Sequence, residues 1–292
     1  MEYLFQQGEI SKGVFRMGSH LKIMDSCGVQ GIEADLLDHH TLHEAMEGVD
    51  VIYYMASPMP DADSDFIKVN TEGVLNVLEA ATEVKAKAFV YLSALDVYGF
   101  VSRTVTPSSP FSPSTEYQKS KAEAERILQE FAKRNGQPRI AILRPAKAVG
   151  PRDESLVVPI LRMVASGKGT LPSSGRMSFS HPKDIAQAMY RATTWNSLSG
   201  AAVLVKSFDA TLVELATQIA TAMGKPFEAG RSGFLARSPL SRYTTEQMKA
   251  SIRIDEQPGW KDLGFAPTYT LKSTCEEIAR WYEKETWVAE DA

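Results

Sequence analysis

A tyrosine and a lysine four residues apart are the side chains in this sequence best suited to chemistry. In the run Tyr117-Gln-Lys-Ser-Lys121, the spacing places both side chains on one face of a helix. A neighbouring ammonium group lowers the pKa of a phenol, and such a phenol can exchange a proton with a carbonyl or an alcohol. The pair therefore suggests interconversion of a ketone and an alcohol. A solvated helix face with no chemical role gives the same spacing.

The elements around this pair indicate a parallel sheet with helices on both faces. Short β-rich runs alternate with longer amphipathic stretches through the first half of the chain, which is typical of a doubly wound α/β fold. We expect strands at residues 9–15, 31–34, 49–55, 88–92 and 139–143 and helices at residues 41–47, 66–84 and 116–135. Tyr117 then lies at the start of the third helix.

The composition excludes several classes of partner. Among 292 residues, 32 basic and 36 acidic side chains are scattered and give a net charge of -4. They form no basic stripe for a phosphate backbone, so we expect no nucleic-acid partner. No apolar run approaches the ~20 residues of a membrane span, and residues 1–7 lack the features of a signal peptide. We expect a cytoplasmic protein that does not contact membranes.

Two further sets of side chains show neither the pattern of a metal site nor that of a disulfide. Cys27 and Cys275 have neither metal-ligand spacing nor the density of a disulfide scaffold. The histidines and the glutamate of residues 39–44 lack a complete ligand set. We interpret these four side chains, His39, His40, His43 and Glu44, as a surface cluster.

Five runs of residues occur in an order that is typical of one protein family. They are Asn70-Thr-Glu-Gly-Val-Leu-Asn-Val-Leu-Glu-Ala-Ala81, Phe89-Val-Tyr-Leu-Ser-Ala-Leu-Asp-Val-Tyr-Gly99, Arg144-Pro-Ala-Lys-Ala-Val-Gly-Pro-Arg-Asp153, Phe179-Ser-His-Pro-Lys-Asp-Ile-Ala186 and Leu263-Gly-Phe-Ala-Pro-Thr-Tyr-Thr-Leu271. With the Tyr117 helix, this order resembles the extended short-chain dehydrogenase/reductases, the NAD-dependent epimerase/dehydratase family. The resemblance covers nearly the whole chain and implies a Rossmann-type sheet.

The resemblance implies two regions of different function. Residues 1–150 would form the dinucleotide-binding domain. After Gly150 the sequence has more loops with Pro and Gly, and residues 151–292 would form mostly a smaller substrate-binding lobe. There we expect helices at 155–165, 182–194, 212–223 and 273–286, an uncertain basic stretch at 230–242, and a strand at 201–205 that rejoins the sheet.

The resemblance also assigns roles to individual residues. Tyr117 would be the general acid/base, and Lys121 would lower its pKa and hold the nicotinamide ribose. Asn70 matches the family's helix asparagine, and it could equally tie two helices together. Asp35 matches the aspartate beside the adenine ring, or it caps the next helix. The expected cofactor contacts are Arg16, Asp35, Leu36, Ala56, Tyr117, Lys121 and Pro145.

The sequence departs from the family pattern at two places. Ala94 stands where the family has a serine or threonine beside the tyrosine, and Ser93 replaces it only if the strand end bends, because neighbouring residues point to opposite sides. The family's glycine loop is also missing, since Gly13 and Gly18 lack its spacing. We therefore expect an N-terminally truncated chain, with residues 9–16 as the family's second strand and a gap in the sheet that exposes apolar side chains.

Together, these expectations predict an NAD(P)-dependent oxidoreductase or epimerase that acts on a secondary alcohol or ketone. Arg16, where relatives that prefer NADP hold a basic residue, favours NADP slightly over NAD. The substrate is a small molecule, either a nucleotide sugar or a ketone of sterol or flavonoid type. Its polar contacts would be Lys147, Arg152, Arg176 and His181. The alternative is a non-catalytic scaffold with a degenerate cofactor site, and a homodimer could form through helices 66–84 and 116–135.

Overall fold

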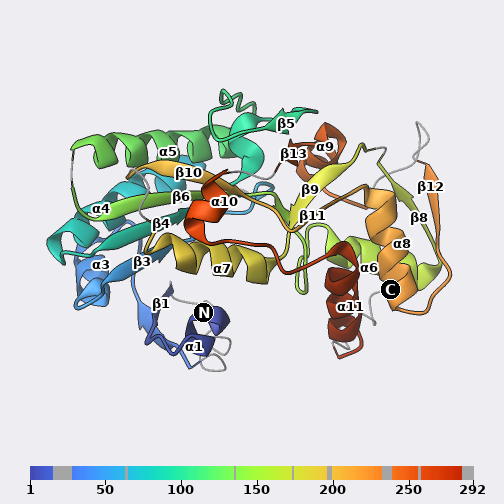
Figure 1. Cartoon of the computed structure of the whole chain (residues 1–292), viewed down its shortest axis with the longest axis horizontal. Coiled ribbons are helices and arrows are strands. Elements are labelled where there is room, and N and C mark those ends of the chain that lie inside the picture. The colour runs from blue at the N-terminus through green and yellow to red at the C-terminus, as the bar shows by residue number, and fades with distance from the viewer. Residues whose placement is uncertain are drawn as a thin grey trace.

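Four parallel strands form the sheet that carries the candidate site (Figure 1). The computed structural model describes residues 1–15, 28–62, 65–134, 136–172, 174–195, 199–231, 239–255 and 258–284. Strands β3 (Val51–Tyr54), β4 (Ala88–Leu92), β6 (Arg139–Pro145) and β10 (Ala201–Val205) lie in the order β10-β6-β4-β3. The first four residues of β4 are buried, as in a strand covered on both faces. The expected doubly wound α/β fold is confirmed.

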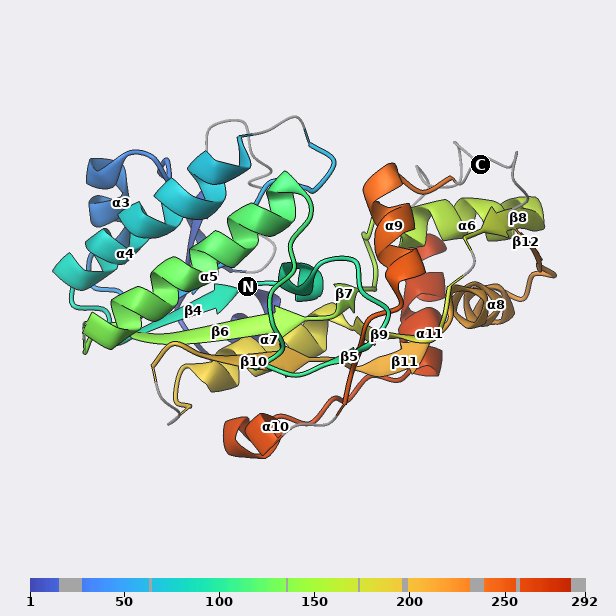
Figure 2. The ribbon, with the colours of Figure 1, turned by 90° about the horizontal axis from the view of Figure 1, so that it is seen from above.

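Helices cover both faces of this sheet (Figure 2). On one face lie α3 (His39–Met46), the π-helical turn Lys68–Glu72, α4 (Gly73–Glu83) and α5 (Glu116–Arg134), which share an apolar core with the sheet around Leu78, Phe89 and Leu128. On the other face, α7 (Pro182–Ala192) and α10 (Pro258–Leu263) enclose a second core with Leu143 and Trp260. The helix expected at 66–84 is thus a π-helical turn followed by an α-helix.

The first two strands form a sheet of their own. β1 (Lys12–Phe15) and β2 (Gln30–Glu33) pair in parallel, and among the described residues no ladder hydrogen bonds join them to β3. The preceding helix α1 (Glu2–Gln6) instead packs on α7, and the Tyr190 hydroxyl donates to Glu9 at 3.0 Å. Apolar side chains of this region, among them Ile10, Val14 and Met55, are exposed. The gap expected from the sequence stays a prediction.

Shorter elements build a lobe beyond the strand ends (Figure 1). They are α6 (Val157–Ser166), β7 (Lys147–Ala148), β8 (Lys168–Leu171), β9 (Met177–Ser180), β11 (Phe208–Ala210), α8 (Leu212–Ala222), β12 (Glu228–Arg231), α9 (Arg242–Ala250) and α11 (Leu271–Tyr282), with the short parallel pair β5 (Thr104–Val105) and β13 (Arg253–Ile254). A core that includes Leu161, Phe179, Leu215 and Ile278 holds α6, β9, α8 and α11 together. The division into regions at residue 150 stays a prediction.

The described residues contain neither a membrane-spanning helix nor a group of metal ligands. Of the helices that the structure describes, none combines the length and apolar character needed to cross a membrane. The described histidine, cysteine, aspartate and glutamate side chains form no group of three that could hold a metal ion. His39 and His43 instead approach Glu83 at 3.4 and 3.9 Å, and His40 approaches Glu44 at 3.5 Å.

Candidate active site

Tyr117 lies where α5 begins, at the edge where the parallel strands β3, β4 and β6 all end. The local sequence fixes this helix start. The Gln118 side-chain oxygen accepts hydrogen bonds from the backbone N–H groups of Ser114 (2.8 Å) and Thr115, and the Thr115 hydroxyl accepts from the N–H of Gln118 at 3.2 Å. These bonds satisfy donors that have no partner in the first turn. The orientation of Tyr117 therefore follows from its neighbours.

The Tyr117 ring is half-buried among other aromatic rings. Phe66 and Tyr243 each meet it edge-on, with ring centroids 5.7 Å away. Burial raises the pKa of Tyr117, the nearby Asp96 carboxylate raises it further, and the Ser57 side chain lowers it. The ring is thus packed against other side chains, and the expected lowering of its pKa by Lys121 stays a prediction.

Lys121 is buried one turn further along α5, with 3% of its surface exposed. Its Nζ donates to the carbonyl oxygen of Leu92, at the end of β4, over 2.9 Å. The same atom lies 4.5 Å from the centre of the Tyr91 ring. Burial lowers the pKa of Lys121 to about 8, although the carboxylates of Glu125 and Asp96 favour its charged form.

A buried ion pair anchors α5 below this lysine. Arg144 of β6 donates to both carboxylate oxygens of Glu125, over 2.9 Å from Nε to Oε1 and 2.6 Å from Nη2 to Oε2. Its Nη1 donates to the Tyr98 hydroxyl at 2.6 Å. Ser93, the expected catalytic serine, is 4% exposed and donates its hydroxyl proton to the same Glu125 carboxylate. The structure therefore places Ser93 in the cluster that holds α5 on the sheet.

Asn70 is fully buried in the π-helical turn before α4. Its Nδ2 donates to the Ser120 hydroxyl at 3.0 Å, and that hydroxyl donates to the Tyr117 carbonyl oxygen at 2.8 Å. These bonds tie the turn to α5. The Asn70 Oδ1 atom has no protein partner, and π-helical turns are frequent at functional sites. The tie between two helices is therefore observed, and the catalytic role of Asn70 stays a prediction.

The other expected cofactor contacts lie at or near the ends of strands. The Asp35 carboxylate, just beyond β2, is exposed and accepts from the Leu37 N–H at 2.9 Å, whereas Asp38 caps α3. Leu36 is partly buried, Ala56 is exposed beyond β3, and Pro145 is the buried last residue of β6. Arg16 lies outside the described residues.

Asp96 is a charged group of the site that the sequence did not single out. It follows β4 in a 3₁₀ turn, which ends at Gly99 with φ of 74°, where a Cβ atom would overlap the Ser112 carbonyl oxygen. The carboxylate accepts from the Tyr243 hydroxyl and from Gln247 Nε2 (3.1 Å), one turn apart on α9. Burial raises the pKa of Asp96, although Tyr243 and Lys147 stabilise its charge.

A small cavity adjoins Asp96. Its volume of about 20 Å³ holds roughly one water molecule. Lys147, Ser178 and Gln247 supply further polar lining groups, and the rest of the lining is largely apolar, with Phe100, Met177 and Met248. Among the basic side chains expected to meet a substrate, Lys147 is the one that reaches this cavity. In the sequence, the spacing of four residues between Tyr243 and Gln247 was the one pattern that could have predicted helix α9.

Arg152, Arg176 and His181 lie elsewhere. Arg152 is exposed, and Arg176 forms an ion pair with Glu214 at 2.8 Å. His181 is 1% exposed and stacks on Tyr269, with the ring centres 3.6 Å apart.

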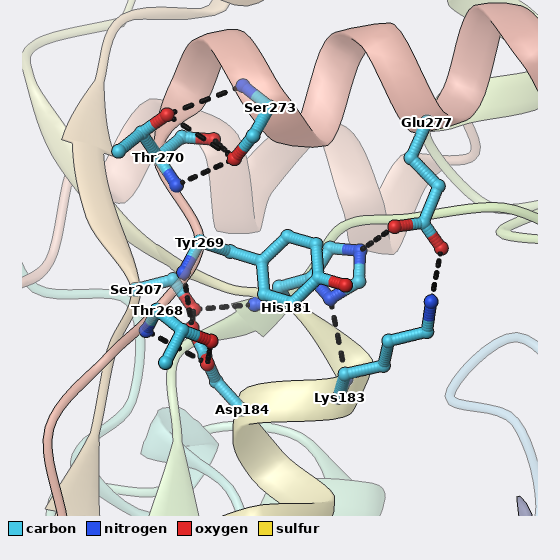
Figure 3. A network of polar contacts seen from close by, with 9 residues as sticks. All are labelled: His181, Lys183, Asp184, Ser207, Thr268, Tyr269, Thr270, Ser273 and Glu277. Atoms are coloured by element: carbon cyan, nitrogen blue, oxygen red, sulfur yellow. Dashed lines mark hydrogen bonds and ion pairs between the residues drawn. The ribbon is translucent and has the colours of Figure 1, made fainter.

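The surroundings of His181 form a polar network that fastens α7 to the C-terminal helix (Figure 3). Glu277 of α11 lies 3.8 Å from His181 and 2.9 Å from the Lys183 ammonium. The buried Asp184 carboxylate accepts from the Ser207 hydroxyl at 2.6 Å and the Thr268 hydroxyl at 2.7 Å. These contacts join elements that are far apart in the sequence. The network around His181 therefore has a structural role.

The described residues fit the nicotinamide and ribose part of a dinucleotide better than its pyrophosphate. Lys121 offers a buried ammonium beside Tyr117. Three buried polar atoms near this lysine, in sequence or in space, lack protein partners: Asn70 Oδ1, Thr71 Oγ1 and the Tyr91 hydroxyl. Within the described ranges, no glycine-rich turn leads from a strand into a helix N-terminus, the usual pyrophosphate site.

Comparison with known proteins identifies the family. The sequence pattern of the NAD dependent epimerase/dehydratase family matches residues 5–204. The sterol demethylase protein B of Methylococcus capsulatus is 24% identical over 96% of this chain and 93% of its own length. An N-acetyl-α-D-glucosaminyl-diphospho-ditrans,octacis-undecaprenol 4-epimerase of Escherichia coli O157:H7 is 30% identical, but the match covers 48% of this chain and 44% of that protein.

Solved structures show the same fold. The UDP-glucuronic acid 4-epimerase of Bacillus cereus, in complex with NAD, superposes with a TM-score of 0.80 over 97% of this chain and 95% of that one, at 17% identity. Such a low identity establishes the fold alone, and the family follows from the sequence pattern. The chain belongs to the NAD-dependent epimerase/dehydratase family.

Proposed function

We propose that this chain is an NAD(P)-dependent oxidoreductase or epimerase that acts on a secondary alcohol or its ketone. The observation that carries the proposal is the placement of Tyr117 and Lys121. The Tyr117 ring packs against Phe66 and Tyr243 at the edge where the strands end, and the ammonium is buried one turn later against the end of β4. A phenol in such a place can move the proton that accompanies oxidation of an alcohol.

Each residue of the site has a distinct task. Tyr117 takes the hydroxyl proton of an alcohol or returns it to a ketone. Lys121 has three N–H donors, of which Leu92 uses one, so the others can bind ribose hydroxyl groups. Asn70 Oδ1 is a free acceptor beside them. When bound, the nicotinamide supplies the acceptor or donor of hydride.

The preference for NADP over NAD rests on Arg16 alone and is part of the proposal. Asp35, Leu36, Ala56 and Pro145 would contact the rest of the dinucleotide because they lie at or near the ends of strands. The small molecule that reacts would enter beside Asp96 and Lys147.

Two substrate classes remain candidates for this site. A nucleotide sugar is the first, and the match to an epimerase of a diphosphate-linked sugar supports it. A ketone or alcohol of sterol type is the second, and it is supported by the longer match to sterol demethylase protein B. Turnover of one class and not the other by the purified chain would choose between them.

We also propose a homodimer that forms through the outer faces of α4 and α5. Leu75 on α4 is 41% exposed, which supplies apolar surface for such a contact. Light scattering of the purified chain tests this, and a monomer at micromolar concentration contradicts it.

The function is tested by measuring cofactor binding first and turnover second. Titration calorimetry with NAD(H) and NADP(H) should show binding, and Tyr117→Phe should abolish turnover while leaving cofactor affinity nearly unchanged. Tyr190→Phe is the matched control, because this tyrosine lies on α7, makes its ring contact with Tyr3 and pairs with Glu9. Unaltered turnover in Tyr117→Phe removes the tyrosine from the mechanism. No binding at millimolar cofactor favours a non-catalytic scaffold, to which Ala94 already points.

A further inference from the structure

The Tyr91 ring lies where Lys121 meets the sheet. The Nζ atom of Lys121 lies over this ring, 4.5 Å from its centre, and donates to the carbonyl oxygen of the next residue, Leu92, at 2.9 Å. A cation over the face of an aromatic ring, within about 6 Å of its centre, is attracted by the negative potential of that face. Two consecutive residues of β4 thus contact the ammonium, one through an aromatic face and the other through a carbonyl oxygen.

The charge of Lys121 depends on few favourable contacts. Burial opposes the ammonium and lowers the pKa of this lysine to about 8, whereas the carboxylates of Glu125 and Asp96 act in the opposite direction. Glu125 is bound to Arg144 and Asp96 to Tyr243, so neither carboxylate is a dedicated partner of the lysine. An aromatic face in direct contact with the ammonium is therefore important for keeping it charged.

Tyr91 is held in place by the neighbouring strand. It is fully buried, and it pairs in register with Tyr54 of β3. The centres of the two rings are 5.7 Å apart, and the Tyr54 hydroxyl donates to the Val69 carbonyl oxygen at 2.7 Å. Burial raises the pKa of Tyr91 well above its ordinary value, so the ring stays neutral. We propose that Tyr91 is the positioning residue of Lys121, and that the face of its ring holds the charged ammonium at the end of β4.

In the proposed function, on which this inference rests, Lys121 acts on Tyr117 as a cation. A carboxylate in contact with the lysine would favour the ammonium but would cancel its field at Tyr117. An aromatic face favours the ammonium without adding a negative charge. The Tyr91 ring can thus keep Lys121 protonated in a buried place and leave its positive charge effective.

Fluorinated rings at position 91 test this contact with little change in packing. Each fluorine withdraws electron density from the ring face and hardly changes the size of the side chain. Tyr91→Phe keeps the face and removes a hydroxyl that has no protein partner, so the pKa of Lys121 should stay nearly unchanged. Trifluorophenylalanine and then pentafluorophenylalanine at position 91 should lower this pKa stepwise, by about 0.5–1 pH unit in total. The measurement is an NMR titration of the Lys121 side chain in the full chain without cofactor.

Phe89 provides a matched control on the same strand. It is fully buried in the same core as Tyr91 and stacks on Tyr54, with ring centres 6.0 Å apart. None of the cation–π contacts among the described residues involves the Phe89 ring. Pentafluorophenylalanine at position 89 should therefore leave the pKa of Lys121 unchanged.

The outcomes separate this inference from the proposed function. The titration needs neither cofactor nor substrate, so it judges Tyr91 even if the chain proves inactive. A pKa of Lys121 that pentafluorophenylalanine at position 91 leaves unchanged overturns the inference. An equal fall with the same residue at position 89 also overturns it, because a general effect on the core would then explain the change. A stepwise fall in a chain that binds no cofactor supports the role of Tyr91 and refutes the proposed function.

Discussion

Glu125 of α5 and Arg144 of β6 form a doubly hydrogen-bonded ion pair in which neither side chain is more than 2% exposed. Lys121 lies one turn before Glu125 on the same helix face. The position of the lysine is therefore set by a contact between α5 and the middle of the sheet.

We predict that Glu125→Gln destabilises the fold, because it leaves the buried guanidinium of Arg144 without a countercharge. The expected loss in the free energy of unfolding is about 3–5 kcal/mol, measured by denaturant titration. Glu130→Gln on the same helix is the control, because its partner Lys133 is exposed and such pairs contribute little. Equal stability of the two variants would show that the buried pair does not anchor α5.

Lys121 should give the protein a distinctive dependence of stability on pH. Its pKa is about 8 in the fold and 10.5 when unperturbed, so the unfolded chain binds more protons between these values. The free energy of unfolding should therefore rise with pH across this window, by about 3 kcal/mol for a shift of this size. The increase is absent below pH 8, where the lysine is charged in both states.

The difference between the stability curves of the wild type and a variant without the lysine separates this effect from those of other groups that titrate. Lys121→Met should lack the increase, whereas Lys119→Met, at an exposed position with a partner at Glu116, should keep it. Parallel stability curves for the wild type and Lys121→Met across pH 8 to 10.5 would refute the lowered pKa.

Asp96 should tune the proton transfer by Tyr117. Because its carboxylate raises the pKa of Tyr117, Asp96→Asn should lower that pKa and move the pH profile of turnover toward acid. The asparagine oxygen can still accept from Tyr243 and Gln247, so α9 stays in place. Glu123→Gln, an exposed carboxylate on α5, should leave the profile unchanged. An alkaline movement in Asp96→Asn would contradict the assignment.

The sequence predicted the elements whose pattern is local. The continuous apolar run of β4 has the predicted bounds, Ala88–Leu92, and α5 begins at the predicted residue, Glu116. α9 was missed because its buried residues Tyr243, Thr244 and Met248 are flanked by polar and basic side chains that obscure a helical period. The start of α3 was placed two residues late, at residue 41, whereas the helix begins at His39 with Asp38 as its cap.

Parts of the site depend on contacts that no local pattern shows. Tyr117 and Lys121 were found because their spacing lies within one helix. The bond from Ser93 to Glu125 needs the packing of α5 on β4. Asp96 becomes a member of the site only when α9, distant in sequence, folds over it.

Because β1 and β2 pair separately from the larger sheet, we expect this pair to open without unfolding of the rest of the chain. Amide protons of β1 and β2 should exchange with solvent through a local opening, faster than those of β4, because few backbone bonds couple the pair to the larger sheet. Asp35 follows β2 directly. A ligand that needs this carboxylate therefore binds only the molecules in which β1 and β2 are closed. Its apparent affinity is the intrinsic affinity multiplied by the closed fraction.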